Sequence, residues 1–291
     1  MERAHHADDH YYDPHGTRWP SIGSLGMITM LASAAYWVNE STVAPWTVLV
    51  GTLILSYMLF GWFGEVIRES EAGLYNAQVD TSFRMGMLWF IFSEVMFFAA
   101  FFGALFYARM FAVPWLGGEG TGAFTNEILW QGYDAVWPTA GPDEVGGSFR
   151  TIPAFGIPFL NTLILLTSGI TVTLAHHALK KNERNRLVFW LLATVVLGFI
   201  FVYFQVYEYM EAYQHLGLTL GSGIYGSTFF MLTGFHGMHV TLGAIMLTVI
   251  AIRSMKGHFK PEHHFGFEAV AWYWHFVDVV WLGLFIFVYV Y

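Results

Sequence analysis

Seven apolar runs, each near the length needed to cross a lipid bilayer, recur along this chain of 291 residues. A membrane helix needs about 20 mainly apolar residues, because it rises about 1.5 Å per residue through about 30 Å of hydrocarbon. The runs lie at about 22–38, 45–64, 85–113, 155–178, 187–210, 225–252 and 269–291. Backbone groups in lipid must be hydrogen-bonded within the protein, so the pattern predicts an all-α, polytopic membrane protein with seven transmembrane helices.

The composition favours the same class. Hydrophobic residues make up 56% of the chain and charged residues 12%, well below the roughly 25% of soluble domains. There is no cysteine, which excludes disulfides, thiolate zinc sites, iron–sulfur clusters and thiolate-bridged copper. Residues 1–21 form a polar segment without the short apolar stretch of a signal peptide, so we expect none there.

The basic residues predict the orientation. Of the 13 lysines and arginines, only Arg109 and Arg150 fall outside when the N-terminus is placed in the cytoplasm. Positive charge gathers on the cytoplasmic side of membrane proteins, so we expect the N-terminus there and the C-terminus outside. The long loop at about 114–154 then lies outside. It is rich in glycine and acidic residues, and we expect it to be irregular but packed down by its tryptophans.

Ionisable residues inside the predicted spans are candidate functional groups, because each costs a few kcal/mol at mid-membrane depth. Glu94 lies among phenylalanines and methionines, where loss of water favours the neutral carboxyl. It is either a proton-relay or gating group, or a carboxyl that hydrogen-bonds a neighbouring helix. His275 and Asp278 lie three residues apart on one helix face and should face other protein.

Three pairs of histidines lie in or near the predicted helices, and histidine is a common metal ligand. His236 and His239 have a spacing that some helical bundles use for metal, but two nitrogens without a third ligand make a weak site. Hydrogen bonding between helices is the favoured interpretation, and no metal site is predicted. The pairs His176-His177 and His263-His264 fall at cytoplasmic helix ends, where solvated or interfacial roles are expected.

Two arginines end predicted helices at the cytoplasmic interface. Arg68 and Arg253 are explained either by the positive-inside rule or by a basic pocket for phospholipid headgroups. The residues alone leave both alternatives open.

Several long motifs resemble the cytochrome c oxidase subunit III family. They appear in family order over roughly residues 60–291. The motifs are Phe92-Ser-Glu-Val-Met-Phe-Phe, Leu160-Asn-Thr, Ala175-His-His-Ala, Gln205-x-x-Glu208-Tyr, Gly223-Ile-Tyr-Gly-Ser-Thr-Phe-Phe, Thr233-Gly-Phe-His-Gly-Met-His-Val, His263-His-Phe-Gly-Phe-Glu and Ala271-Trp-Tyr-Trp-His-Phe-Val-Asp-Val-Val-Trp-Leu.

The resemblance implies a seven-helix subunit without haem or copper, in which helices 1–2 (22–70) splay from a five-helix bundle (84–291). The cleft between them would hold phospholipid. Trp62, Arg68 and Glu69 match family residues at one wall of that cleft. Arg253, Lys256 and His258 match the other wall, and Glu94 matches a buried carboxylate of the third helix. The segment 70–78 departs from the family's usual Gly-His-His or Thr-Pro character.

By resemblance, the chain is subunit III of a proton-pumping cytochrome c oxidase of aerobic respiration, in a bacterial inner or mitochondrial inner membrane. It would contact subunit I directly, and subunit II, smaller subunits and cytochrome c through the complex; haem and copper belong to those partners. Nucleic acid is not an expected partner. Histidines of the N-terminal segment could pass protons toward uptake: His5, His6, His10 and His15. A disordered polar tail is the alternative. A quinol oxidase subunit III and an autonomous transporter remain the competing functions.

Overall fold

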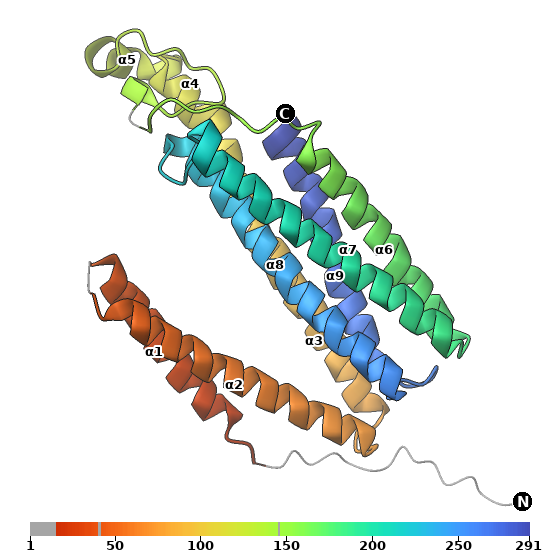
Figure 1. Cartoon of the computed structure of the whole chain (residues 1–291). Helices are drawn as coiled ribbons and strands as arrows, with labels where there is room; N and C mark the ends of the chain where they lie inside the picture. Colours follow the sequence, from red (N-terminus) through yellow and green to blue (C-terminus); the bar gives the residue numbers. More distant parts are fainter. Residues whose placement is uncertain (1–15, 40–41, 145) are drawn as a thin grey trace, which may run out of the picture. The chain divides into compact units, whose positions relative to one another are not determined.

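The computed structural model describes residues 16–39, 42–144 and 146–291, and helices dominate them (Figure 1). Seven helices are long and apolar enough to cross a membrane, which confirms the predicted fold class. Their bounds are α1 (Trp19–Val38), α2 (Ala44–Glu71), α3 (Ala77–Tyr107), α6 (Ile157–Lys180), α7 (Arg184–Glu211), α8 (Gly223–Lys256) and α9 (Phe265–Leu284). Single π-helical turns extend α3, α7 and α9: η2 (Ala108–Ala112), η5 (Ala212–Leu216) and η6 (Phe285–Val290).

The helices run past the apolar stretches that predicted them. The stretch 225–252, for example, lies inside α8, which has 34 residues. At its C-terminal end the polar turn Arg253–Lys256 continues the helix beyond the apolar stretch, where water or headgroups satisfy the free backbone groups. Proline in the first turn starts α1, α2 and α6, since it lacks an N–H that would be unpaired there anyway.

The C-terminal end of α8 is capped from α7. Gly257 follows α8 with φ +80°, a left-handed conformation that glycine adopts without strain. The guanidinium of Arg184 donates to the carbonyl oxygens of Ser254 (3.2 Å) and Met255 (2.9 Å). The Ser254 carbonyl also accepts from the backbone N–H of Gly257 at 3.1 Å. The cation of Arg184 supplies further donors at this helix end and complements the negative end of the helix dipole.

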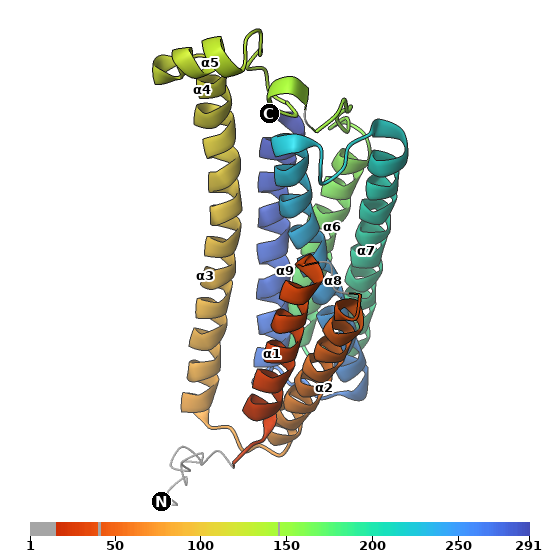
Figure 2. The same cartoon turned by 90° about the vertical axis from the view of Figure 1, so that its left-hand side faces the viewer.

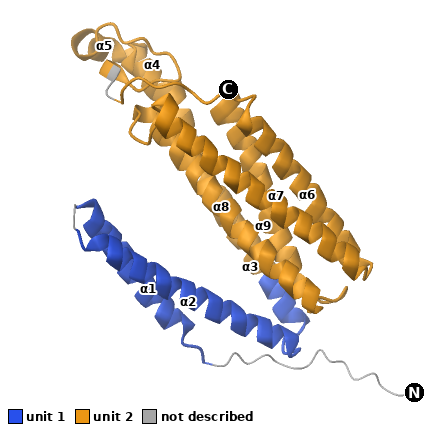
Figure 3. Cartoon of the chain, in the orientation of Figure 1, with its two compact units in different colours: residues 1–83 blue, residues 84–291 orange. Residues whose placement is uncertain are grey.

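The chain divides into two compact units, residues 1–83 and 84–291 (Figure 3). The first unit holds the α1–α2 hairpin and the start of α3. A side-chain carbon at Gly51 would lie 2.6 Å from the backbone nitrogen of Met30, so only glycine permits this approach of the two helices. The indole N–H of Trp19 donates to the Glu65 carboxylate across the hairpin.

The second unit is built on four helices, α6 to α9 (Figure 2). In the chain order α6, α7, α8, α9, neighbours pack together, and α9 also packs against α6. The helix α3 joins them through its phenylalanines: Phe97 contacts Phe235 of α8 (centroids 5.0 Å apart) and Phe98 contacts Phe276 of α9 (6.1 Å).

Two fully buried tryptophans of α9 lie at the centre of this unit. The indole N–H of Trp274 donates to Ser168 Oγ, and that of Trp281 donates to Thr162 Oγ1, both at 2.9 Å. A side-chain carbon at Gly198 or Gly243 would lie 2.8 Å from the Trp274 ring. Small residues on α7 and α8 therefore make room for the indole, and its polar group bonds α6.

The loop at about 114–154, which we expect on the outer side and call the outer loop, is more ordered than the sequence predicted. It contains two short helices, α4 (Val113–Leu116) and α5 (Ala123–Leu129), and two 3₁₀ turns, η3 (Gly120–Gly122) and η4 (Pro142–Glu144). The side-chain amide of Asn126 donates to the carbonyls of Leu116 and Trp130 and holds α5 in place. Among the tryptophans of the loop, Trp137 packs on Tyr225 of α8 with centroids 5.6 Å apart.

Candidate functional site

An ionisable pair joins α3 to α8 within the predicted membrane region. Glu94 Oε2 lies 2.8 Å from His239 Nε2, and the two side chains are 22% and 6% exposed. Rings of Phe97 and Phe98 lie 6.0 and 5.0 Å from the imidazole. Two residues that are 145 positions apart in the chain thus share one apolar site.

The hydrogen bond of the other His239 nitrogen, Nδ1, limits the protonation states that the Glu94–His239 pair can adopt. Nδ1 lies 2.6 Å from the carbonyl oxygen of Phe235, which can only accept, so Nδ1 carries a proton. A neutral imidazole then presents a bare Nε2, to which a protonated Glu94 donates. The alternative is an imidazolium that donates to a carboxylate. Either way the pair is neutral overall and holds one shared proton, which lowers the cost of placing two ionisable groups in lipid.

His236, one turn before His239, bonds a different helix. Its Nε2 lies 3.2 Å from the backbone carbonyl of Val277 on α9, and the side chain is fully buried. The ring packs against Phe201 and Trp281, with centroids 5.7 and 5.1 Å away. The two histidines therefore face two neighbouring helices: His236 Nε2 bonds a carbonyl oxygen of α9, and His239 Nε2 bonds the carboxyl of Glu94 on α3.

His275 and Asp278 lie on the face of α9 that meets α6. Asp278 Oδ2 is 3.7 Å from His275 Nδ1, and His275 Nε2 is 3.3 Å from Thr173 Oγ1. A side-chain carbon at Gly169 would lie 2.5 Å from Asp278 Oδ2. The glycine thus makes the space in which this buried carboxyl rests, while His275 remains exposed.

A further buried carboxyl was not predicted as a site residue. Glu208 of α7 is 1% exposed, and the hydroxyl of Tyr289 donates to its Oε1 at 2.5 Å. Gln205, one turn earlier, is also buried. The signal was present in the sequence as a carboxyl and an amide one turn apart on the same helix face within an apolar run.

The residues expected at a lipid site fall in both units, and each group is described within its own unit. In residues 1–83, Trp62 and Arg68 are exposed, and Glu69 accepts a hydrogen bond from the Tyr75 hydroxyl at 2.7 Å. In residues 84–291, the Arg253 guanidinium lies over the Phe259 ring, 4.5 Å from its centroid. Lys256 is exposed and His258 half-buried at the same end of α8.

Comparison with known proteins shows which family this chain resembles along nearly its whole length. The sequence matches the family described as cytochrome c oxidase subunit III over residues 10–126 and 130–291. It is 43% identical to the cytochrome c oxidase subunit 3 of Marchantia polymorpha over 281 residues, which cover 96% of this chain and 95% of that protein. Identity to the subunits of Oncorhynchus mykiss and Gadus morhua is 40% over the same shares.

The chain belongs to the cytochrome c oxidase subunit III family. It is therefore a subunit of the cytochrome c oxidase complex of the respiratory chain, with other oxidase subunits as partners. The motifs that carried the resemblance supply buried residues to α6, α7, α8 and α9, among them Asn161, Glu208, His236 and Trp274. The N-terminal segment and the outer loop of this subunit III chain also carry residues that the sequence analysis discussed. The histidines of the former, His5, His6, His10 and His15, lie outside the described residues.

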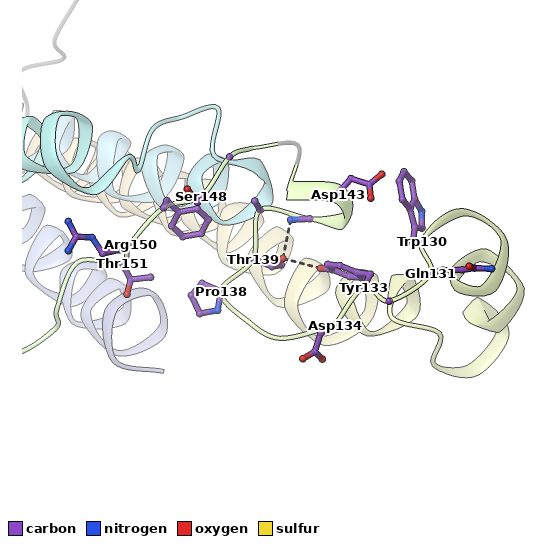
Figure 4. Close-up of a pocket in the computed structure, with 15 residues that line it drawn as sticks. Trp130, Gln131, Tyr133, Asp134, Pro138, Thr139, Asp143, Ser148, Arg150 and Thr151 are labelled. Atoms are coloured by element: carbon purple, nitrogen blue, oxygen red, sulfur yellow. Dashed lines mark hydrogen bonds between the residues drawn. The ribbon is translucent and has the colours of Figure 1, made fainter.

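The outer loop of this subunit III chain forms an open groove of about 760 Å³ (Figure 4). The Tyr133 hydroxyl and Thr139 Oγ1 lie 3.1 Å apart, and the same Oγ1 accepts from the backbone N–H of Gly141. Arg150 ties the far end of the groove to η5, because its backbone N–H donates to Leu216 and its guanidinium to the carbonyl of His215. The polar groups of the groove named here therefore form hydrogen bonds within the protein, and these bonds hold the loop in its conformation.

Proposed function

We propose that this chain is a non-redox subunit that stabilises the haem–copper core of the oxidase, with α3 against subunit I. The observation that carries the proposal is the Glu94–His239 pair. It fixes α3 to α8 while Trp89, Phe92 and Met96 of the same helix stay exposed. An apolar helix surface held in one orientation suits either lipid or a partner subunit, and family membership supplies the partner.

The test uses Glu94 variants in the assembled oxidase. In Glu94→Gln, the amide N–H can donate to His239 Nε2, so we expect near-normal oxygen turnover and proton pumping. In Glu94→Ala, the buried Nε2 loses its partner, at a cost of about 1–3 kcal/mol. We expect looser subunit association or a shorter working life. Thr167→Ala is the matched control, because the exposed Thr167 hydroxyl of α6 bonds the Leu163 carbonyl of its own helix and lies away from α3's exposed face. Lost pumping in an intact Glu94→Gln complex would show instead that the proton itself matters.

The redox part of the proposal has a separate test. The sequence has no cysteine, and in the part of the chain that the structure describes the buried His236 and His239 bond oxygens of neighbouring helices, which leaves them unsuited to haem. The isolated subunit should show no haem absorbance, and oxygen reduction should require the partner subunits. One firmly bound haem per chain would contradict the proposal.

Phospholipid binding is a second role, favoured by arginines near helix ends in a respiratory membrane. The planar guanidinium forms paired hydrogen bonds with phosphate, which the point charge of lysine reproduces poorly. We propose that Arg68, with Trp62 and Glu69 near it in the first unit, binds a phospholipid headgroup. Arg253, with Lys256 and His258 at the same end of α8 in the second unit, is proposed to do the same.

The lipid test measures tightly bound phospholipid in the purified complex. The double variant Arg68→Ala with Arg253→Ala should lose lipid, and the corresponding double lysine variant should lose less. Arg186→Ala is the control, because Arg186 is an exposed basic residue whose guanidinium pairs with Glu183 at 2.9 Å. Lipid content that stays the same in the double alanine variant would reject this role.

Support of proton uptake by the N-terminal segment is a third role. It depends on a cytoplasmic or matrix position of that segment, which the distribution of basic residues favours. Replacement of His5, His6, His10 and His15 by Asn removes groups that titrate near neutral pH and keeps the aspartates. Turnover from about pH 6.5 to about pH 9 should then fall more steeply than in the parent. Deletion of residues 2–15 with an unchanged profile would leave the segment without this role.

A further inference from the structure

Three potential metal ligands meet at one end of the second unit. His176 comes from the last turns of α6, and His264 and Glu268 come from the start of α9, 88 and more residues later. The two Nε2 atoms lie 3.3 Å apart. Glu268 Oε1 is 3.4 Å from His176 Nε2 and 3.3 Å from His264 Nε2. The three atoms form a nearly equilateral triangle.

From this triangle we propose a zinc site in which His176, His264 and Glu268 bind Zn²⁺ and a water completes the coordination. Zinc binds imidazole nitrogen at about 2.0–2.1 Å and carboxylate oxygen at about 2.0–2.2 Å, with tetrahedral geometry. The edge of a tetrahedron is about 1.63 times its centre-to-corner distance, so such bonds place ligand atoms roughly 3.3–3.4 Å apart. The observed separations match three corners of a zinc tetrahedron.

Direct hydrogen bonding explains the triangle less well. Hydrogen bonds from N–H to oxygen have a preferred length of about 2.9–3.0 Å, and both Nε2–Oε1 separations exceed it. The third separation, 3.3 Å, joins two imidazole nitrogens. Each imidazole also turns the same nitrogen, Nε2, toward a single point that Glu268 Oε1 shares. Three groups that each offer one lone pair to a common centre are arranged as ligands, and a centre with two imidazoles and one carboxylate suits zinc.

The surroundings hold these side chains in place. Arg84 of α3 bonds Glu268 Oε2, which leaves Oε1 turned toward the histidines. The His176 ring packs on the buried Phe267, with centroids 5.4 Å apart. The backbone N–H of Glu268 donates to the His264 carbonyl, and this first turn of α9 places the two side chains on one face. Support of this kind around the ligands is typical of built metal sites.

Burial and charge define the affinity to expect. His264 and Glu268 are 8% and 12% exposed and His176 is 24% exposed, so an ion can enter beside His176 and keep one water. Among the described residues one carboxylate, that of Glu268, faces the site, while Arg84 and Lys180 bring positive charge near it. We therefore expect reversible, micromolar binding. A bound ion would tie the last turns of α6 to the first turn of α9.

The experiment compares zinc binding by the purified, chelator-treated oxidase complex and its variants. Other subunits can also bind zinc, so the measured quantity is the difference in saturable Zn²⁺ per complex. His176→Gln, at the more exposed position, should remove one Zn²⁺ per complex or weaken its binding on the order of 100-fold. The double variant His177→Gln with His263→Gln is the matched control, since both are exposed histidines adjacent to the site, and it should bind as the parent does.

A second measurement uses the unmodified complex and does not depend on variant folding. Zn²⁺ should slow diethylpyrocarbonate modification of His176 and His264 and leave His177 and His263 unaffected, as read by mass spectrometry. Equal zinc content in the parent and His176→Gln would overturn the site. So would equal loss in the control pair, or modification that zinc fails to slow at His176 and His264.

Discussion

The hairpin α1–α2 and the bundle α6–α9 use similar residues in opposite ways. In the hairpin, small hydroxyl side chains satisfy their own helix: Ser24, Thr29, Thr52 and Ser56 each donate to the carbonyl four residues earlier. Such bonds hide a polar group from lipid and add nothing between helices. What joins the two helices is close packing at glycine and the bond from Trp19 to Glu65.

In the bundle, the same kinds of group reach across helices. Ser168 accepts from Trp274, and the hydroxyls of Thr171 and Thr194 lie 2.8 Å apart between α6 and α7. Burial differs too: of an 18-residue apolar window, 44% is buried in α6, α8 and α9 and 33% in α7, against 17% in α1 and 6% in α2. The bundle therefore carries its own core, whereas the hairpin leaves most of its surface to lipid or to other protein.

The largest effect should come from filling the bundle core. In Gly243→Ala, the new carbon would lie 2.8 Å from the Trp274 ring, and Gly198 brings α7 equally close to the other side of that ring. Such overpacking costs about 1–3 kcal/mol. Gly237→Ala is the control, with its nearest neighbour an ordinary 3.7 Å away. The retained amount of this subunit and its dissociation temperature should fall for Gly243→Ala alone; equal behaviour of the two variants would remove the argument for a rigid core.

A second substitution tests whether the hairpin is independent. Gly51→Ala would place a carbon 2.6 Å from the Met30 backbone, which can yield only if α1 moves. Hydrogen exchange should accelerate in α1 and α2 and stay unchanged in α6–α9. Gly64→Ala, with no atom within 4 Å, should change neither region. Faster exchange in the bundle as well would mean that both regions open as one cooperative unit.

The sequence was sufficient for the seven spans because length and apolarity are local properties of each helix. The exact ends were not predictable, since polar turns such as the last turn of α8 continue a helix that the hydrophobic stretch does not require. The order of the outer loop was also missed. Its short helix α5 depends on Asn126 bonding two carbonyls, a tertiary detail without a local pattern.

For the site, the sequence identified individual residues and not their partners. Glu94 and His239 were both singled out, but their pairing across 145 positions depends on how α3 and α8 are rotated and aligned. One residue along a helix turns a side chain by about 100°, so a small shift changes every partner. The same reason hid the approach of His176 to His264.

A smaller loss of stability should distinguish a hydroxyl that bonds a neighbouring helix from one that bonds its own helix. Thr171→Val keeps the side-chain shape and removes the buried bond to Thr194. Hydrogen bonds between membrane helices average about 0.6 kcal/mol and reach about 2 kcal/mol, so the dissociation temperature should fall slightly. Thr52→Val removes only a bond to its own helix and should have no measurable effect. A larger loss in Thr52→Val would contradict the comparison between bundle and hairpin.

A comparably small effect should come from removal of the polar bond within the hairpin. The Trp19 ring lies so close to Gly61 that a side-chain carbon there would fall 1.9 Å from it, and its N–H donates to Glu65. Trp19→Phe keeps most of the ring contact and removes the donor, at about 0.5–1.5 kcal/mol for one hydrogen bond. Exchange in α1 and α2 should rise less than in Gly51→Ala, and Trp46→Phe, at an exposed tryptophan, should leave it unchanged. If Trp19→Phe opens the hairpin as far as Gly51→Ala does, the polar bond rather than close packing holds these two helices together.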